Sequence, residues 1–200
     1  MTFLPPDFYL RPTLTVAREL LGKTLVRRLD ATTLSGRIVE VEAYHQHGDA
    51  SCHCRNGPTA RNEVMFRAGG HLYVYFTYGM HFCMNVVTEE EGIGAAVLIR
   101  AIEPLEGIEI MRQHRKGDKP DRGLADGPAK LCQALAIGRE ENGIFLDGSV
   151  AGILDAPVVP DGELQRSSRI GITLGRELPW RYFIASSPWV SRARPSGERK

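Results

Sequence analysis

Cysteine is scarce in this sequence, with only Cys52, Cys54, Cys83 and Cys132 among 200 residues. So few thiols do not make a disulfide framework, and they predict a protein of a reducing compartment. Apolar runs of bilayer length are absent, and the stretch before Asp7 is too short and too rich in proline for the core of a signal peptide. We therefore expect a cytoplasmic protein with no secretion signal and no membrane partner.

An excess of charge of either sign is also absent, because the net charge is only +1. Bulk electrostatic attraction to nucleic acid is thereby excluded, and any such binding must come from local clusters of Lys and Arg. Two clusters exist, the first made of Arg112, Arg115, Lys116, Lys119 and Arg122, the second of Arg192, Arg194, Arg199 and Lys200. Either cluster taken alone is more typical of a solvated face, or of a flexible basic tail over residues 191–200, than of a binding site.

Repeats, low-complexity tracts and heptads are absent as well, and 42% hydrophobic residues are enough for a core, so we expect one domain over residues 1–200. Periodicity predicts helices at 14–21, with Thr13 as N-cap, at 105–114 and at 129–137, with a helical turn at 62–66. Strands are predicted at 23–29, 34–44, 71–76, 82–87, 95–103, 144–146, 170–173 and 181–185.

The segment His71–Asn85 carries the most regular pattern. Apolar and aromatic side chains alternate along its first half, with Leu72, Val74 and Phe76 on one face and His71, Tyr73 and Tyr75 on the other. This period predicts a strand with one core face and one aromatic face. Gly79 allows a tight reversal, so we expect a β-hairpin with Tyr78 at its tip. An exposed tip tyrosine either packs on a neighbouring element or acts as a wedge that replaces a displaced base in stacked nucleic acid.

Two carboxylates interrupt the predicted strand 34–44. Glu40 and Glu42 share one face with Ile38 and Tyr44, opposite Val39, Val41 and Ala43. A solvent-facing side would explain them, but the loop that follows consists mostly of residues that do chemistry, namely His45, His47, Asp49, His53, Arg55 and Arg61. Loops of this composition carry function more often than packing. The strand and its loop are therefore the candidate site.

Zinc is an alternative explanation of this loop, since His45, His47, Cys52, His53 and Cys54 are suitable ligand types. Their spacing matches none of the usual zinc patterns, and neighbours on an extended chain point to opposite sides. The H-x-E and P-C-x-x-C motifs of the zinc nucleobase deaminases are also absent. We expect no metal and no cofactor.

Two single cations stand out. Arg100 lies inside the apolar strand 95–103 and is either paired structurally or aimed at a carboxylate or phosphate. Lys130 lies in the first turn of the helix 129–137, where backbone N–H groups also point outward, so it suits a phosphate contact.

Short motifs, in one order over nearly the whole chain, resemble the alkyladenine (3-methyladenine) DNA glycosylase family. They are RIVEVEAY at 37–44, His53, Arg61-Asn62 with Met65-Phe66, GHLYVY at 70–75, YGM at 78–80, CMN at 83–85, LIRA at 98–101, EPLEG at 103–107, GPAKLCQAL at 127–135 and SPWVS at 187–191. No single motif identifies the family, but so many matches in register do not arise by chance.

The resemblance implies an α+β (mixed α/β) fold, a single compact domain around a curved, mostly antiparallel β-sheet with a protruding β-hairpin and flanking helices. It implies a monomeric, monofunctional base-excision repair enzyme, nucleoid-associated if bacterial, that flips damaged purines out of double-stranded DNA. The implied lesions are 3-methyladenine, 7-methylguanine, hypoxanthine and ethenoadenine. By position it assigns catalysis to Glu42, as general base, and Arg100, the base pocket to Tyr44, His53, Tyr75 and Asn85, the wedge to Tyr78, and DNA backbone contacts to Lys130 and Ser187.

The sequence departs from the family after Tyr44, where Gln46-His47 replaces Gly-Pro and two cysteines replace the small residues beside His53. Alkylated purines are cationic leaving groups, so one carboxylate acting on water can suffice for their hydrolysis. The alternative is a non-catalytic module that senses distorted nucleic acid through the Tyr78 hairpin. Glu42 has no task in such a module.

Overall fold

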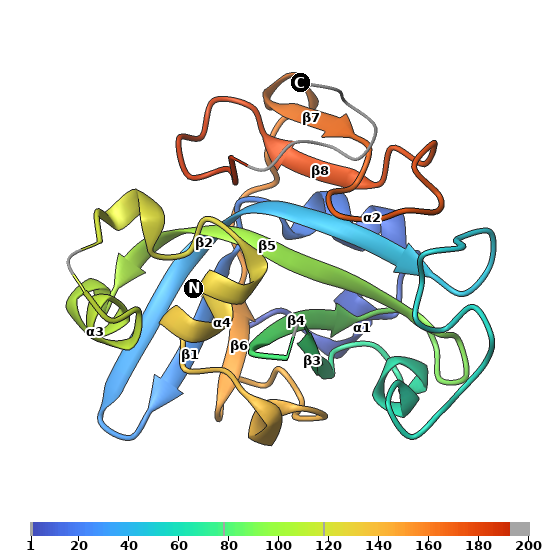
Figure 1. Cartoon of the computed structure of the whole chain (residues 1–200), viewed down its shortest axis with the longest axis horizontal. Helices are drawn as coiled ribbons and strands as arrows, with labels where there is room; N and C mark the ends of the chain where they lie inside the picture. Colours follow the sequence, from blue (N-terminus) through green and yellow to red (C-terminus); the bar gives the residue numbers. More distant parts are fainter. Residues whose placement is uncertain (1, 78, 118, 193–200) are drawn as a thin grey trace.

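A computed structural model gives the conformation of residues 2–77, 79–117 and 119–192. The predicted wedge Tyr78 and residues 193–200 of the predicted basic tail lie outside the described residues. The named strands form one antiparallel sheet in the order β3-β4-β5-β2-β1-β6, with β8 paired to β2 and β7 paired to β8 (Figure 1). Helices flank this sheet, which confirms the predicted α+β fold.

The strands are β1 (Thr24–Leu29), β2 (Thr32–His45), β3 (Leu72–Thr77), β4 (His81–Val87), β5 (Ala95–Glu106), β6 (Ala151–Leu154), β7 (Leu164–Ser167) and β8 (Arg181–Ile184). The helices are α1 (Pro6–Tyr9), α2 (Thr13–Leu20), α3 (Ile108–His114) and α4 (Pro128–Ala134). Short 3₁₀ turns are η1 (Glu63–Phe66), η2 (Asp121–Gly123), η3 (Arg139–Glu141) and η4 (Asp161–Glu163).

Strand β2 is the centre of the sheet. One edge pairs with β1 along its first half and with β8 from Glu40 to Glu42, and the other edge pairs with β5 along its length. The pairing with β5 shifts register near Glu40. Bulges of this kind bend a strand and turn its side chains. The side chains of Glu40 and Glu42 on this strand are both 0% exposed.

The main hydrophobic core joins the other face of β2, with Val39, Val41 and Ala43, to the buried residues of α2 and α4. Helix α2 packs against β2 and β5, and α4 packs against β4 and β5. A second, smaller core cluster gathers Cys52, Cys54, Val64, Met65, Tyr73, Val87 and Ala96. Because Cys52 and Cys54 belong to the loop after β2, this smaller cluster packs the loop of the predicted site against the hairpin and β5.

The β-hairpin is confirmed as β3 and β4, with Tyr75 opposite Cys83 and Tyr73 opposite Asn85. Leu72 and Val74 are buried as predicted, but Phe76 is 44% exposed, so its predicted place in the core is wrong. The hairpin extends beyond the core at this point, and Phe76 contacts Phe82 on the paired strand instead.

Several predicted bounds differ from the structure. Helix α3 begins at Ile108, because β5 continues to Glu106 and Gly107 adopts a left-handed conformation between them. Helix α4 ends at Ala134, shortly before Ala136 with its positive φ. The predicted strand 144–146 is reduced to an isolated antiparallel bridge between Phe145 and His71, and the predicted strand 170–173 is wrong, whereas β6 and β7 lie where none was predicted. Thr13 is the first residue of α2 and not its cap, since its hydroxyl bonds Thr88 and Glu89.

Among the described residues, no helix combines the length and the apolar character that a membrane crossing requires.

Candidate active site

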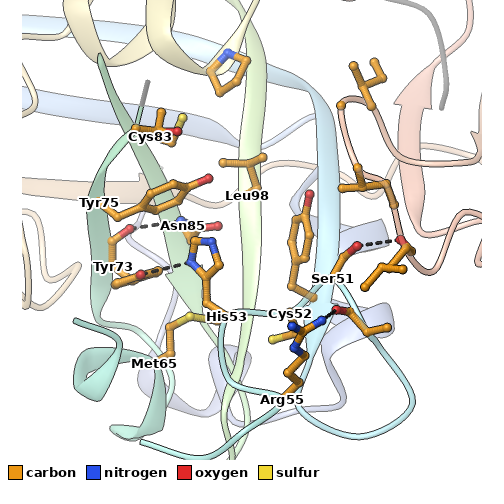
Figure 2. A pocket seen from close by; sticks show the side chains of 18 of the residues that line it. Ser51, Cys52, His53, Arg55, Met65, Tyr73, Tyr75, Cys83, Asn85 and Leu98 are labelled. Carbon is orange, nitrogen blue, oxygen red and sulfur yellow. Dashed lines mark hydrogen bonds between the residues drawn. The ribbon is translucent and has the colours of Figure 1, made fainter. Parts of the chain in front are cut away.

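A pocket of about 610 Å³ opens among the β3–β4 hairpin, the end of β2 and the loops 46–61 and 168–180. Figure 2 shows Tyr73, Tyr75 and His53 together on one side of this pocket and Ser51 on the other. The sequence-predicted residues that line it are Tyr44, His53, Tyr75, Asn85 and Arg100. The structure therefore brings together side chains from β2, β3, β4, β5 and the loop after β2.

The aromatic wall of the pocket consists of Tyr73, Tyr75 and His53. The two tyrosine rings stack with centroids 5.5 Å apart, and the His53 ring stands edge-on to Tyr75 at 4.8 Å. The Tyr73 hydroxyl lies 3.2 Å from Nδ1 of His53. Burial raises the pKa of Tyr73 to about 12, so this hydroxyl keeps its proton at neutral pH. The wall is aromatic and its tyrosines are uncharged, which suits contact with an aromatic ligand.

His53 is held in place by the backbone around it. The buried amide of Asn62 donates to the carbonyls of His53 (2.8 Å) and Gly57 (3.1 Å), and its oxygen accepts from the Thr59 N–H (2.6 Å). Burial and then the positive charge of Arg61 lower the pKa of His53 below its ordinary value of 6.5. The imidazole is therefore neutral at pH 7.

Glu42 lies directly behind the pocket lining, with a side chain that is fully buried. Its Oε2 accepts hydrogen bonds from the Tyr44 hydroxyl (2.9 Å) and Nη1 of Arg100 (3.1 Å), and its Oε1 accepts one from the Ile170 N–H (2.7 Å). Tyr44, Arg100 and Ile170 all line the pocket.

Glu40 differs from Glu42 in the number and origin of its donors. Its Oε1 accepts from Nε of Arg100 (3.1 Å), Nε of Arg181 (2.7 Å) and the Ser191 hydroxyl (2.9 Å). Its Oε2 accepts from the Ser191 N–H (2.7 Å). Neither Arg181 nor Ser191 lines the pocket. Glu40 is therefore a structural anion that holds Arg100, Arg181 and the end of the described chain against β2.

Tyr44 connects the pocket to a further ion pair. Its hydroxyl donates to Glu42, and its ring lies 4.5 Å from the guanidinium carbon of Arg169. Burial, followed by the charge of Glu42, raises the pKa of Tyr44 well above its ordinary value. Arg169 forms two hydrogen bonds with Asp49, at 2.5 and 2.6 Å. The buried charged residues beside the pocket are thus three carboxylates and three guanidinium groups, whose formal charges balance: Glu40, Glu42, Asp49, Arg100, Arg169 and Arg181.

The remaining predicted residues lie around the pocket. Asn85 donates from its amide to the Tyr73 carbonyl at 3.2 Å, which fixes its orientation in the pocket. Lys130 is exposed in the first turn of α4, paired with Asp126 at 2.7 Å, and the neighbouring Pro128 lines the pocket. Ser187 is half-buried after β8, and its hydroxyl accepts a hydrogen bond from the Trp189 N–H at 3.3 Å.

The residues considered as zinc ligands are dispersed. All four cysteines are free and buried, and Sγ of Cys54 contacts Sδ of Met65 at 3.4 Å. His45 pairs with Glu89 at 3.3 Å. Among residues 2–77, 79–117 and 119–192, no group of three or more His, Cys, Asp or Glu side chains is placed to hold a metal ion.

Sequence reasoning gave no site role to several residues that build this site, namely Asn62 as a support, Tyr73 in the aromatic wall, and Arg169 and Ile170 in the second loop. Asp49 was named as part of the candidate loop, but its partner Arg169 was not predicted. The Arg61-Asn62 pair was a motif of the resemblance, but no role was assigned to Asn62. Arg169 gave no signal, and Ile170 was predicted to begin a strand.

Comparisons with known proteins agree with this geometry. The family model described as Methylpurine-DNA glycosylase matches residues 7–188. A Chlorobaculum parvum protein is 49% identical over 100% of this chain and 96% of its own length, and a Methanocella arvoryzae protein is 49% identical over 98% of both. A Carboxydothermus hydrogenoformans protein is 48% identical over 94% of this chain and 98% of its own length. All three carry the name "Putative 3-methyladenine DNA glycosylase". With a family match over residues 7–188 and relatives 48–49% identical over nearly its whole length, this chain belongs to the methylpurine-DNA glycosylase family.

Proposed function

We propose that this chain draws a damaged purine out of double-stranded DNA and hydrolyses its N-glycosidic bond, with Glu42 as the general base. The observation that carries the proposal is the difference between the two buried glutamates. All three described donors to Glu42 line the pocket, whereas Arg181 and Ser191, which donate to Glu40, do not. General-base hydrolysis requires a proton acceptor within reach of the attacking water, and the place of Glu42 directly behind the pocket lining supports this role.

The aromatic wall supports the extrusion of a base. Unstacking and unpairing a nucleotide cost a few kcal/mol, and stacking of the extruded base on an aromatic side chain returns about 1–3 kcal/mol. Tyr44, His53 and Tyr75 line the pocket that would receive the base. We assign to Tyr78 the complementary task of filling the gap in the duplex.

Two polar residues complete the proposed base pocket. Arg100 contacts both buried glutamates and lines the pocket, so it would hold Glu42 and orient the water beside it. The Asn85 amide is fixed by its bond to the Tyr73 carbonyl. Because it cannot swing aside without losing this bond, it would act as a steric gate against unmodified guanine.

Contacts to the DNA backbone are assigned to Lys130 and Ser187. A phosphate would share the Lys130 ammonium with Asp126, next to the pocket mouth at Pro128. We propose a monomeric enzyme that acts where the chromosome lies, in the cytoplasm and on the nucleoid of a bacterium.

The proposed lesions fall into two chemical groups. The purines 3-methyladenine and 7-methylguanine carry a positive charge and leave readily, whereas hypoxanthine and ethenoadenine are neutral and leave less readily. Activation of water matters more when the leaving group is poor. We therefore expect the neutral lesions to depend more strongly on Glu42 than the cationic lesions.

A release assay over these four lesions in duplex DNA tests the proposal. The expected products are the free base and an intact abasic strand, since no lysine among the described residues lines the pocket to form a Schiff base. Binding to the lesion without release of any base would instead favour the non-catalytic sensor. Strand cleavage without added alkali would show a different mechanism.

A further inference from the structure

Arg169 is the largest fully buried side chain among the described residues, and its charge is paired with Asp49. Nη1 lies 2.5 Å from Oδ2 and Nη2 lies 2.6 Å from Oδ1, so two parallel hydrogen bonds join the groups. Both side chains are 0% exposed, and neither residue lines the pocket. Apolar residues of the same volume often stabilise a fold as well as a buried ion pair does, so stability alone does not account for this pair.

The pair joins the two loops that form the pocket. Asp49 belongs to the loop 46–61, which carries His53, and Arg169 belongs to the loop 168–180, which carries Ile170. Nη1 of Arg169 also donates to the Ala43 carbonyl of β2 at 2.9 Å. A second tie between the same loops, from the Ser51 hydroxyl to the Leu174 carbonyl (2.6 Å), is visible as a dashed line in Figure 2.

Two of the three donors that orient Glu42 depend on this pair. Ile170, whose N–H donates to Oε1, is the next residue after Arg169 in the chain. Tyr44, whose hydroxyl donates to Oε2, has its ring against the Arg169 guanidinium at 4.5 Å, and Trp180 lies near the same guanidinium at 5.4 Å. If the guanidinium moves, both donors lose their support.

We propose that Arg169 and Asp49 are positioning residues that hold the Glu42 carboxylate, through the Ile170 N–H and the Tyr44 hydroxyl, in its orientation behind the pocket lining. This inference rests on the proposed function. Neither residue touches substrate or reacting atoms. Because the pair acts on the geometry of the base and not on DNA binding, its loss lowers the rate of base release and leaves the affinity for DNA unchanged.

The test variant is Arg169→Met with Asp49→Asn. Removing both charges avoids an unpaired buried ion, and the asparagine oxygen can still accept from the Ser51 N–H, as Asp49 does at 3.0 Å. The matched control is Arg27→Met with Glu141→Gln. This second buried pair joins β1 to η3 at 2.7 Å, none of its atoms lines the pocket, and glutamine keeps an acceptor for the Gly138 N–H.

Three quantities are measured for wild type and both double variants: the single-turnover rate on a hypoxanthine duplex, the Kd for an abasic duplex, and the Tm. Misplacing a catalytic group by about 1 Å costs up to about 100-fold in rate, so we expect a fall of about 10- to 100-fold in the Arg169/Asp49 variant. Its Kd should stay within about twofold of wild type. The Arg27/Glu141 control should lose Tm but keep the wild-type rate at temperatures where it is folded.

A wild-type rate in the folded Arg169/Asp49 variant, or an equal loss of rate in the control, would overturn the inference. If the double variant does not fold, Arg169→Lys decides the question, because it keeps the charge but loses the paired geometry and the flat contact with Tyr44. It should then show the same loss of rate at unchanged Kd, and a wild-type rate would again refute the inference. A wild-type protein that releases no base would contradict the proposed function itself, which is a different outcome.

Discussion

Replacing Glu42 or Glu40 by glutamine makes the same chemical change two residues apart, and the structure predicts different results. At Glu42, an amide nitrogen in the place of Oε1 would face the Ile170 N–H, and in the place of Oε2 it would face Arg100. Either orientation sets a donor against a donor, at a cost of about 1–3 kcal/mol. For a chain of this size, 1 kcal/mol corresponds to about 2–4 °C in Tm. Glu42→Gln should therefore stay folded.

Glu40→Gln should be the more damaging change for the fold. It leaves Arg181 without a carboxylate partner among the described residues and weakens the hold on Ser191. In Glu42→Gln, by contrast, Arg100 still pairs with Glu40. Breaking a buried ion pair in this way costs about 3–5 kcal/mol, which corresponds to a larger loss of Tm. The effect of Glu40→Gln on the reaction should be indirect, through the freedom that Arg100 gains beside Glu42.

The rates should follow the opposite order. Loss of a general base lowers a rate by about 10²- to 10⁴-fold, or about 2.7–5.5 kcal/mol in the barrier. We expect this fall in Glu42→Gln on hypoxanthine or ethenoadenine duplexes in single turnover, with binding retained in a gel-shift assay. Glu40→Gln, measured below its Tm, should stay within about tenfold of wild type, which is less than the smallest fall expected for a lost base. Near-wild-type release by Glu42→Gln, or a collapse of the rate only in Glu40→Gln, would refute the assignment of the base.

Three other perturbations have defined outcomes. Tyr78→Ser should raise the cost of extruding a base, because the gap in the duplex is no longer filled; unchanged fluorescence of a reporter base beside the lesion would show that Tyr78 is not a wedge. Since burial and Arg61 lower the pKa of His53, the imidazole gains a proton only in acid, where it would repel a cationic base. The ratio of the 7-methylguanine release rate to the hypoxanthine release rate should then fall only below about pH 6.5. In Arg61→Gln, His53 binds its proton more readily, so this ratio should begin to fall at a higher pH. A ratio that does not change with pH in either protein would contradict this prediction. Binding to an abasic duplex should weaken steeply between about 50 and 200 mM salt, and undetectable binding at low salt would contradict the DNA-binding function. Activity should survive a chelator; stoichiometric zinc in the purified protein, with activity lost when the zinc is removed, would contradict this expectation.

Local patterns predicted the hairpin and the central strands well. Leu72 and Val74 follow a period of two because one face of β3 packs in the core, and this period is visible in the sequence. The prediction was wrong for Phe76, because the hairpin extends beyond the core there. The alternation of apolar side chains continues to Phe76, although no core packs against that end of the strand. Periodicity shows which faces are apolar, but it does not show where a neighbouring layer ends.

The candidate site could be predicted only in part. Glu40 and Glu42 stood out as charges on a strand, and Arg100 stood out as a charge in an apolar run. Their mutual contact depends on the pairing of β2 with β5, including the register shifts near Glu40, which no short motif records. Arg169 lies 120 residues from Asp49 in the chain, so no local pattern could connect them.

Two glutamates can be buried on β2 only because their partners arrive from other segments. Arg100 comes from β5, Arg181 from β8, and Ile170 from the loop between β7 and β8. An unpaired buried carboxylate costs several kcal/mol, so this arrangement requires all of these segments to dock on β2. The same segments also create the difference between the glutamates, since Arg181 and Ser191, which donate to Glu40, do not line the pocket, whereas every described donor to Glu42 does. The position of the proposed base is therefore determined by which segments dock beside each carboxylate, and not by where a carboxylate occurs in the sequence.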